Sequence, residues 1–327
     1  MTTRITLSQA FQQGVREEME QDDSIIVLGT DMVERGGHFA QLRGIGTEFP
    51  GRVRDAPISE AAMVAAGVGA ALNGLRPIVD LNFIDFALGA MDEIVNQAAK
   101  ARFMWGRGVP LVIRGTAGIA FYAAQHNNSL EAGFAHTPGL LVVMPSTPAD
   151  TKGLIKSALR SGDPVVFLMH KSLTGLRGEV PEGEHVVPLG QAAIRRAGDD
   201  VTLVSYGALV ARAERVAERL EAEGIAVEVI DLRTLFPLDL ATIEASVRRT
   251  GRLVVASEAP RHGGIGGEIA AAIQESAFYY LDAPIQRVGA LHTPISHSPP
   301  LIAAAIPSEE QLERAIRATL QPEGAAA

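Results

Sequence analysis

Glu60 is the carboxylate whose surroundings in the sequence are best suited to chemistry. It ends the run Asp55–Glu60 and precedes a segment rich in small residues, Ala61–Ala71. Small side chains would let another backbone or a flat ligand come close to the carboxylate. The alternative is a solvated helix start, where a glutamate gains about 0.3–1 kcal/mol from the helix dipole. These residues alone leave the two interpretations equally open.

A polar loop that contains a histidine is the second candidate. The loop Ala123–Glu131 follows a turn of small residues, Gly115–Gly118. The side chain of His126 titrates near neutral pH, so it could act as a general acid or donate to a transition state. The alternative is a loop histidine that caps a turn, and the loop by itself favours that alternative.

Two aromatic residues flank an acid just after a predicted strand. Phe83 and Phe86 lie on either side of Asp85. Phe86 could stack on a flat heterocycle. Phe83 continues the apolar run of the strand, so we expect it to anchor the next helix.

Other chemistries lack their motifs. The run Gly263–Gly267 lies between a strand and a helix, as a dinucleotide loop would, but Glu268 takes the place of the last small residue. We therefore expect a turn or an anion-facing loop there. The sequence has no phosphate loop ending in Gly-Lys-Ser/Thr and no Gly-x-Ser-x-Gly elbow. No carboxylate lies between His292 and His297, so we do not expect a zinc pair.

Composition limits the classes of protein. The chain has 327 residues, 47% of them hydrophobic, which indicates about two domains with a sizeable core. A net charge of −9 gives no basic face for nucleic acid. The absence of cysteine excludes disulfides and thiolate chemistry. No apolar run approaches the ~20 residues that span a bilayer. We expect a soluble, cytoplasmic protein with no membrane association.

Short apolar strands alternate with helical patterns along the chain. This alternation predicts an α/β fold of two doubly wound domains, each with a parallel sheet covered on both faces. A stretch rich in Gly and Pro, Ser172–Pro188, is expected to link the domains. In the first half we expect strands at Ile25–Leu28, Ile78–Phe83, Leu111–Ile113, Leu140–Val143 and Val165–Leu168, and helices at Met63–Leu72, Leu88–Met104 and Ala149–Ser161.

Several motifs occur together in one order along the chain. They are Ile58–Glu60, Asn82–Phe86, Gln125–Glu131, Thr137–Leu140, Val143–Pro148, Lys152–Ile155 and Val229–Asp239. In these motifs the chain resembles the β subunits of the thiamine-diphosphate-dependent, decarboxylating first component of 2-oxo acid dehydrogenase complexes. That group includes the pyruvate, branched-chain and acetoin enzymes. The resemblance runs from about Thr6 to Leu320.

The resemblance implies a transketolase-like architecture and roles for four residues. Residues 1–180 would form the pyrimidine-binding domain and residues 188–323 the transketolase C-terminal domain. Glu60 matches the glutamate that hydrogen-bonds the aminopyrimidine ring of thiamine diphosphate and so activates the cofactor. Phe86 matches the aromatic that stacks on the pyrimidine, and His126 matches the histidine near the substrate. Asn82 is placed with the cofactor-binding residues, although many relatives carry Gln there.

The resemblance also implies a second chain. In the family Mg²⁺ is held by Gly-Asp-Gly followed by Asn, and this sequence has no such module, because Pro164 follows Gly162-Asp163 and Asp200 follows Gly198-Asp199. An α subunit should therefore supply the Mg²⁺ site, in a heterotetramer of two α and two β chains with the cofactor between them. The acyl group would pass to the lipoyl acyltransferase core of a complex.

Two further features depart from the family. Asn127-Asn128 replaces the more usual Ser-Gln or Ser-Asp after His126, which bears on substrate preference. Relatives often hold a structural potassium ion through backbone carbonyls, and Ser161 replaces a usual Asp in that set. The matching positions here are Leu111, Ala158, Leu159, Ser161 and Asp163.

We expect an enzyme subunit that decarboxylates a 2-oxo acid or cleaves acetoin. One alternative is a split transketolase acting on sugar phosphates, which would need basic residues in the site loops. Arg114 is one candidate for that role and His38 a weaker one. The other alternative is a non-catalytic scaffold subunit, and the intact Glu60 and His126 argue against it.

Overall fold

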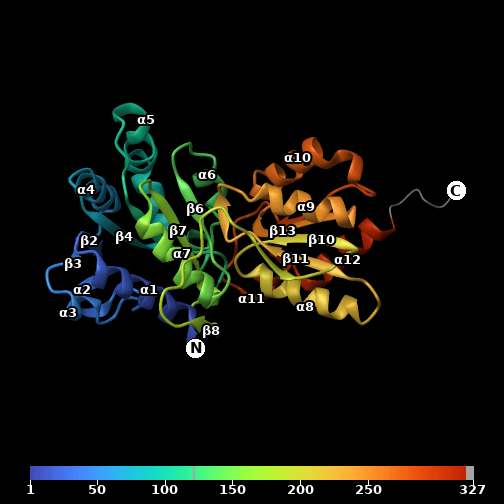
Figure 1. The fold of residues 1–327 in the computed structure, drawn as a ribbon, viewed down its shortest axis with the longest axis horizontal. Helices are drawn as coiled ribbons and strands as arrows, with labels where there is room; N and C mark the ends of the chain where they lie inside the picture. The colour runs from blue at the N-terminus through green and yellow to red at the C-terminus, as the bar shows by residue number, and fades with distance from the viewer. Residues whose placement is uncertain (121, 322–327) are drawn as a thin grey trace. The chain divides into compact units, whose positions relative to one another are not determined.

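The computed structural model describes residues 1–120 and 122–321 (Figure 1). The chain divides into two compact units. The first comprises Met1–Ala117 and Gly133–Leu189, and the second comprises Gly118–Ala132 and the chain from Gly190 onward. The loop with His126 is therefore inserted in the sequence of the first unit but packs as part of the second.

A parallel sheet forms the centre of the first unit. Its strands follow the order β6-β7-β5-β4-β2-β3, and each neighbouring pair is parallel. Every residue of β5 and β7 is buried, as a sheet covered on both faces requires. The doubly wound prediction is confirmed. The strands are β2 (Ile25–Gly29), β3 (Val53–Asp55), β4 (Arg76–Phe83), β5 (Val112–Ala117), β6 (Leu141–Val143) and β7 (Val165–His170).

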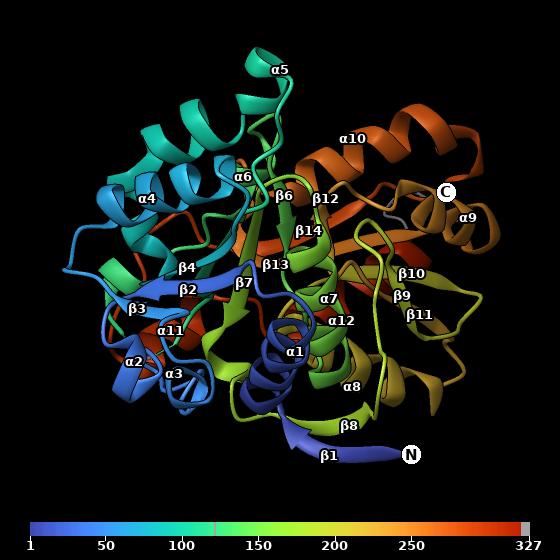
Figure 2. The same cartoon turned by 60° about the vertical axis from the view of Figure 1, so that its left-hand side comes forward.

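Helices cover both faces of this sheet. Helix α1 (Leu7–Gln21) begins at a capping box, in which Thr6 and Gln9 bond each other's backbone. It packs on α7 (Pro148–Arg160), whereas α4 (Glu60–Leu72) lies on the opposite side of β2 and β4 (Figure 2). Gly67 of α4 permits this approach, because an added Cβ would lie 2.6 Å from Val79 of β4. The short helices are α2 (Met32–Arg35), α3 (Ile45–Glu48) and α6 (Glu131–Ala135).

The segment after β4 differs from the single helix expected at Leu88–Met104. It forms a 3-10 helix, η1 (Ile84–Ala90), a π-helical turn, η2 (Glu93–Ala98), and a short α5 (Ala101–Trp105). In η1 the buried residues Ile84, Ala87 and Ala90 recur every third residue, which is the period of a 3-10 helix. The helix sits tightly on β5, because a Cβ at Gly115 would lie 2.8 Å from Ile84.

The predicted linker contains ordered structure. Strand β8 (Arg177–Pro181) pairs antiparallel with β1 (Thr2–Thr6), which the sequence analysis did not identify. The short 3-10 helix η4 (Lys171–Leu173) precedes it. The residues up to Leu189 thus belong to the first unit.

The second unit is a smaller α/β layer. Its strands follow the order β14-β13-β10-β11-β9, with β9 antiparallel to β11 and the other pairs parallel. Helices α8 and α12 share an apolar core with β10 and β11. The elements are β9 (Ala193–Arg196), β10 (Val201–Ser205), α8 (Leu209–Glu221), β11 (Val227–Asp231), β12 (Thr234–Phe236), α9 (Leu240–Thr250), β13 (Leu253–Pro260), α10 (Ile265–Ala277), η5 (Phe278–Tyr280), β14 (Gln286–Ala290), α11 (Pro299–Ala305) and α12 (Glu309–Leu320).

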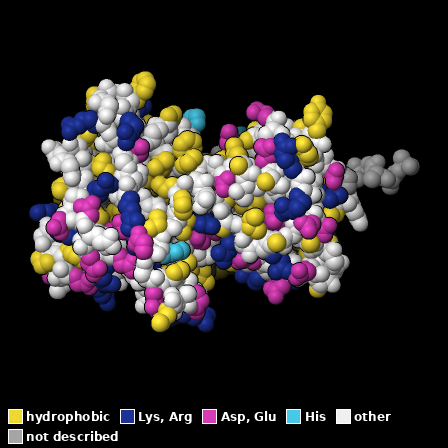
Figure 3. Space-filling model, viewed as in Figure 1, with side chains coloured by type: hydrophobic (Ala, Val, Ile, Leu, Met, Phe, Trp, Pro, Cys, Tyr) yellow, Lys and Arg dark blue, Asp and Glu magenta, His cyan; other side chains and the backbone are white. Residues whose placement is uncertain are grey.

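Acidic and basic side chains are interspersed over the face drawn in Figure 3, without a broad patch of one sign. The described residues include no helix with both the length and the apolar character needed to cross a membrane.

Candidate active site

Glu60 is the first residue of helix α4 and is half-buried. The N-cap residue, Ser59, makes no side-chain capping bond. Among the residues that the structure describes, none hydrogen-bonds or ion-pairs with the Glu60 carboxylate. Both oxygens are therefore able to accept a hydrogen bond from a ligand.

Asn82 lies near the end of β4 in a left-handed backbone conformation, with φ of 60°. Its amide donates to Asp80 Oδ1 at 2.8 Å, and its own Oδ1 accepts from the amide of His38 at 3.2 Å. Asparagine tolerates this conformation better than most residues do. The Asn82 side chain thus joins the end of β4 to the loop that carries His38.

Phe86 protrudes from η1 with 39% of its surface exposed. Its ring meets that of Phe83 edge to face at a centroid distance of 6.2 Å, whereas Phe83 itself is buried. The expectation that Phe83 is an anchor agrees with this burial. Helix α4 packs against both β4 and η1, so Glu60, Asn82 and Phe86 come from three adjoining elements.

These residues fit a planar aromatic ligand that bears hydrogen-bond donors. Glu60 offers an acceptor that has no partner within residues 1–120 and 122–321, and Phe86 offers an exposed ring for stacking. The described residues contain no cluster of three or more His, Cys, Asp or Glu side chains arranged to hold a metal. The aminopyrimidine half of a thiamine diphosphate site is consistent with this geometry.

His126 lies in the second unit, at the end of the short helix η3 (Ala124–His126), and is half-buried. The loop before it begins at Gly118, with φ of 79°, and contains Ala123 at φ 61° and ψ −179°. Two side-chain acceptors bind the backbone amides of Ile119 and Ala120, near the start of this loop. Glu258 Oε2 accepts from Ile119 N at 3.2 Å, and Asn127 Oδ1 accepts from Ala120 N at 2.9 Å.

A buried phenol–carboxylate pair supports the same loop at its other end. The hydroxyl of Tyr206 donates to Glu131 Oε1 at 2.8 Å, and both side chains are buried. Burial, followed by the negative charge of Glu131, raises the pKa of Tyr206 well above its ordinary value, so the phenol keeps its proton. Tyr206 and Glu258 were not identified from the sequence.

A cavity of about 120 Å³ lies beside this loop, within the second unit. Asn127 and Glu258 bring the buried polar groups to its wall, and Ile119 and Ile295 bring apolar surface. None of the residues that line it carries a positive charge.

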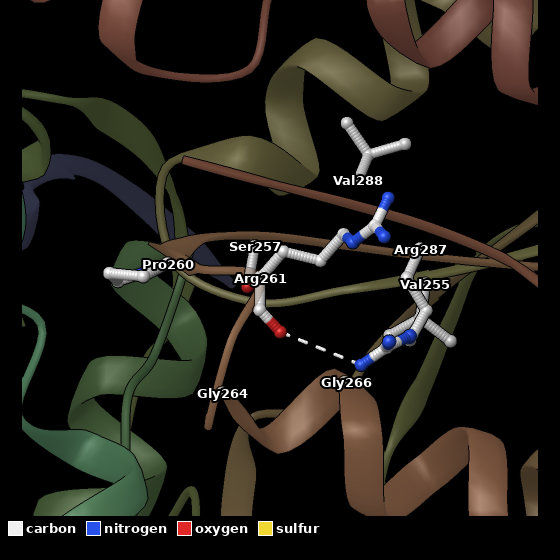
Figure 4. A pocket seen from close by; sticks show the side chains of 8 residues that line it. All are labelled: Val255, Ser257, Pro260, Arg261, Gly264, Gly266, Arg287 and Val288. Atoms are coloured by element: carbon white, nitrogen blue, oxygen red, sulfur yellow. Dashed lines mark hydrogen bonds between the residues drawn. The ribbon is translucent and has the colours of Figure 1, made fainter. Parts of the chain in front are cut away.

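The glycine-rich run near residue 265 forms a helix start. Gly264 is the N-cap of α10, and the Arg287 guanidinium lies against the first turn, 3.2 Å from the place of a Cβ on Gly267 (Figure 4). Arg287 also donates to the carbonyl of Arg261 at 3.5 Å. The space that remains is about 10 Å³, room for about one water and not for a dinucleotide.

The carbonyl oxygens expected to hold potassium already accept hydrogen bonds from the protein. Arg76 Nη1 donates to Leu159 O at 2.8 Å and to Ser161 O at 2.9 Å. Backbone amides bond the carbonyls of Leu111 and Ala158, and the Ser161 hydroxyl bonds that of Asp163. The set therefore does not fit potassium unless the guanidinium of Arg76 moves away.

The chain matches two family models. One, described as the transketolase pyrimidine-binding domain, matches residues 3–177, and the other, described as the transketolase C-terminal domain, matches residues 190–312. A solved split-gene transketolase, described as an inactive tetramer of β chains, has a TM-score of 0.82 at 26% identity, over 97% of this chain and 98% of that one.

Curated relatives cover almost the whole chain. It is 45% identical to the β subunit of an acetoin:2,6-dichlorophenolindophenol oxidoreductase of Cupriavidus necator, over 98% of this chain and 99% of the relative. Identity is 42% with the β subunit of the pyruvate dehydrogenase first component of Rhizobium meliloti (96% and 69% covered). It is 40% with the β subunit of 2-oxoisovalerate dehydrogenase of Bacillus subtilis (94% and 96% covered).

Proposed function

This chain belongs to the β subunits of the pyruvate, 2-oxoisovalerate and acetoin dehydrogenases, and from that premise we propose that it carries half of a thiamine-diphosphate site. The proposed reaction is decarboxylation of a 2-oxo acid, or cleavage of acetoin, with transfer of the acyl group to a lipoyl domain. One observation carries the assignment. The Glu60 carboxylate, with no protein partner among the described residues, starts a helix that packs on the element bearing the exposed Phe86 ring.

Each residue then has a defined task. Thiamine diphosphate, when bound, supplies the acidic carbon that attacks the substrate carbonyl. Glu60 would accept a hydrogen bond from a ring nitrogen of the aminopyrimidine and would thereby favour its imino form. Phe86 orients the ring by stacking on it. Asn82 closes the site next to the His38 loop, and His126 donates a proton to the reacting oxygen or the lipoyl sulfur.

We propose that an α subunit completes the site, in a heterotetramer of two α and two β chains. Magnesium requires several oxygen ligands in octahedral order, and the described residues provide no acidic cluster for it. The metal and the diphosphate would therefore be bound by the α chain. The acyltransferase core of a multienzyme complex would receive the product.

Potassium remains a prediction of the family resemblance. We propose that the guanidinium of Arg76, which donates to the carbonyls of Leu159 and Ser161, takes the place of the ion at this set.

The split-transketolase alternative loses its main candidate for phosphate binding. Arg114 is 2% exposed, and its guanidinium is taken up by Asp80 at 2.8 Å. A phosphate ligand would have to break this buried pair. We therefore favour the dehydrogenase.

The test is a co-expressed αβ enzyme assayed by dye reduction with acetoin, pyruvate and 3-methyl-2-oxobutanoate. We expect Glu60→Gln to lower kcat by about 100-fold or more with each accepted substrate, because the amide is a weaker acceptor and cannot favour the required tautomer. Glu310→Gln is the matched control, because Glu310 is also a glutamate in the first turn of a helix. A Glu60→Gln enzyme with most of its activity would exclude the proposed role.

A further inference from the structure

We infer that Asn127 is a positioning residue, which together with Glu258 holds the His126 loop in a strained conformation. The inference rests on the proposed role of His126.

The loop is fixed at two successive amides. Ile119 N donates to the Glu258 carboxylate at 3.2 Å and Ala120 N donates to Asn127 Oδ1 at 2.9 Å. Ile119 also packs on Ile295 and Ile302 in an apolar cluster of the second unit. The start of the loop is therefore attached by both polar and apolar contacts.

Between these attachments and His126 the backbone is strained. Ala123 has φ 61° and ψ −179°, a region that is nearly confined to glycine. Only two residues separate it from His126, whose amide donates to Ala123 O at 3.2 Å. An unfavourable conformation next to a reactive side chain persists only when the surroundings hold it.

Asn127 is placed to hold the backbone of Ala123 in this conformation. The residue is 3% exposed, so water competes little for the Ala120 amide. The Asn127 oxygen bridges the two ends of the turn that contains Ala123. Its nitrogen Nδ2 has no hydrogen-bond partner among the described residues, so truncation to alanine removes a single side-chain hydrogen bond, the one from Ala120 N.

Glu258 and Asn127 attach the loop in different ways. Glu258 comes from β13, in the sheet of the second unit, and ties the loop to that sheet. Asn127 comes from the loop itself and closes it on itself. Loss of Asn127 should therefore release the turn around Ala123 without detaching the loop from the unit.

The experiment uses the co-expressed αβ enzyme loaded with thiamine diphosphate and Mg²⁺. We expect Asn127→Ala to lower kcat about 10- to 100-fold through displacement of His126, with KM changed by about twofold or less. The double variant Asn127→Ala/Ala123→Gly should recover at least about threefold of that loss, because glycine adopts this φ without strain. Asn73→Ala is the matched control, since Asn73 makes one amide bond to a backbone oxygen at the end of α4, outside the loop.

His126→Ala separates this inference from the proposed function. If His126→Ala retains full activity, the proposed role of the histidine is wrong. If His126→Ala is impaired while Asn127→Ala is not, the positioning role alone is overturned. Loss of activity in Asn127→Ala that Ala123→Gly does not restore would also overturn it, because a general packing defect would not respond to a change at residue 123.

Discussion

Arg114 and Asp80 form an ion pair at 2.8 Å in which each side chain is only 2% exposed. The pair joins the neighbouring strands β5 and β4. The Asp80 carboxylate also accepts a hydrogen bond from the backbone amide of Asn82. The conformation at the end of β4, next to the proposed cofactor site, thus depends on a buried charge.

We predict that Asp80→Asn destabilises the chain by about 3–5 kcal/mol, because it leaves the buried Arg114 guanidinium without its counter-charge. Urea unfolding of the isolated chain measures this change. Arg35→Ala is the control, since it breaks an exposed pair with Asp31 and should cost about 0–1 kcal/mol. A loss of stability that is equal in the two variants would contradict the prediction.

A second prediction concerns acid stability. Hydrogen bonds from Arg160 and then Lys156 lower the pKa of the Glu184 carboxyl to about 2, below its ordinary value of 4.5. The folded chain therefore binds fewer protons there than the unfolded chain does. The stabilising contribution is complete above pH 4.5 and is lost as the pH falls toward 2. Because Glu184 is 56% exposed, solvent screening keeps the contribution small.

Glu184→Gln should accordingly lower the free energy of unfolding at neutral pH, and the deficit should shrink as the pH falls below 4.5. Urea titrations across this range measure it. Glu182→Gln serves as a neighbouring control, because Glu182 accepts a neutral hydroxyl bond from Thr3. A deficit that is independent of pH would show that the charge of Glu184 is irrelevant.

A third prediction concerns potassium. Because Arg76 already donates to two of the expected carbonyls, replacing sodium with potassium should leave the melting temperature of the chain unchanged. Arg76→Met should cost about 1–3 kcal/mol, because it leaves those carbonyls without donors. It should also make the chain more stable in potassium than in sodium.

Arg102→Met is the matched comparison for this experiment. Arg102 bonds the carbonyl of Gly162 and the side-chain carboxylate of Asp163, and so donates to none of the five backbone carbonyls of the set. Stabilisation of the unmodified chain by potassium over sodium would mean that the ion displaces or joins Arg76.

The sequence predicted those elements whose pattern is local. The short apolar runs Leu111–Ile113 and Val165–Leu168 predicted two strands, which the structure extends to Val112–Ala117 and Val165–His170. The region of Ile84–Ala90 was missed because three apolar residues at a spacing of three resemble an ordinary helix face. Strand β1 was missed because its exposed, polar residues show no alternation until β8 pairs with it.

In the candidate site, too, the sequence predicted residues in local motifs but not contacts between distant residues. Glu60, Phe86 and His126 could be proposed because each lies in a compact motif. Tyr206 and Glu258 could not, because they reach the histidine loop from residues 75 and 139 positions away from their partners. Only the sheet, which brings the ends of β10 and β13 together, shows this connection.

The placement of Gly118–Ala132 in the second unit has a consequence for synthesis on the ribosome. Ile119 belongs to a small apolar cluster with Ile295 and Ile302, so this cluster of the second unit contains a residue that is translated long before its partners. The histidine loop cannot form its contacts with Glu258, Ile295 and Ile302 until those later residues have been translated. A fragment that begins at Gly190 would lack this loop. The second unit is therefore discontinuous in sequence, and one crossover between genes could not transfer either unit whole.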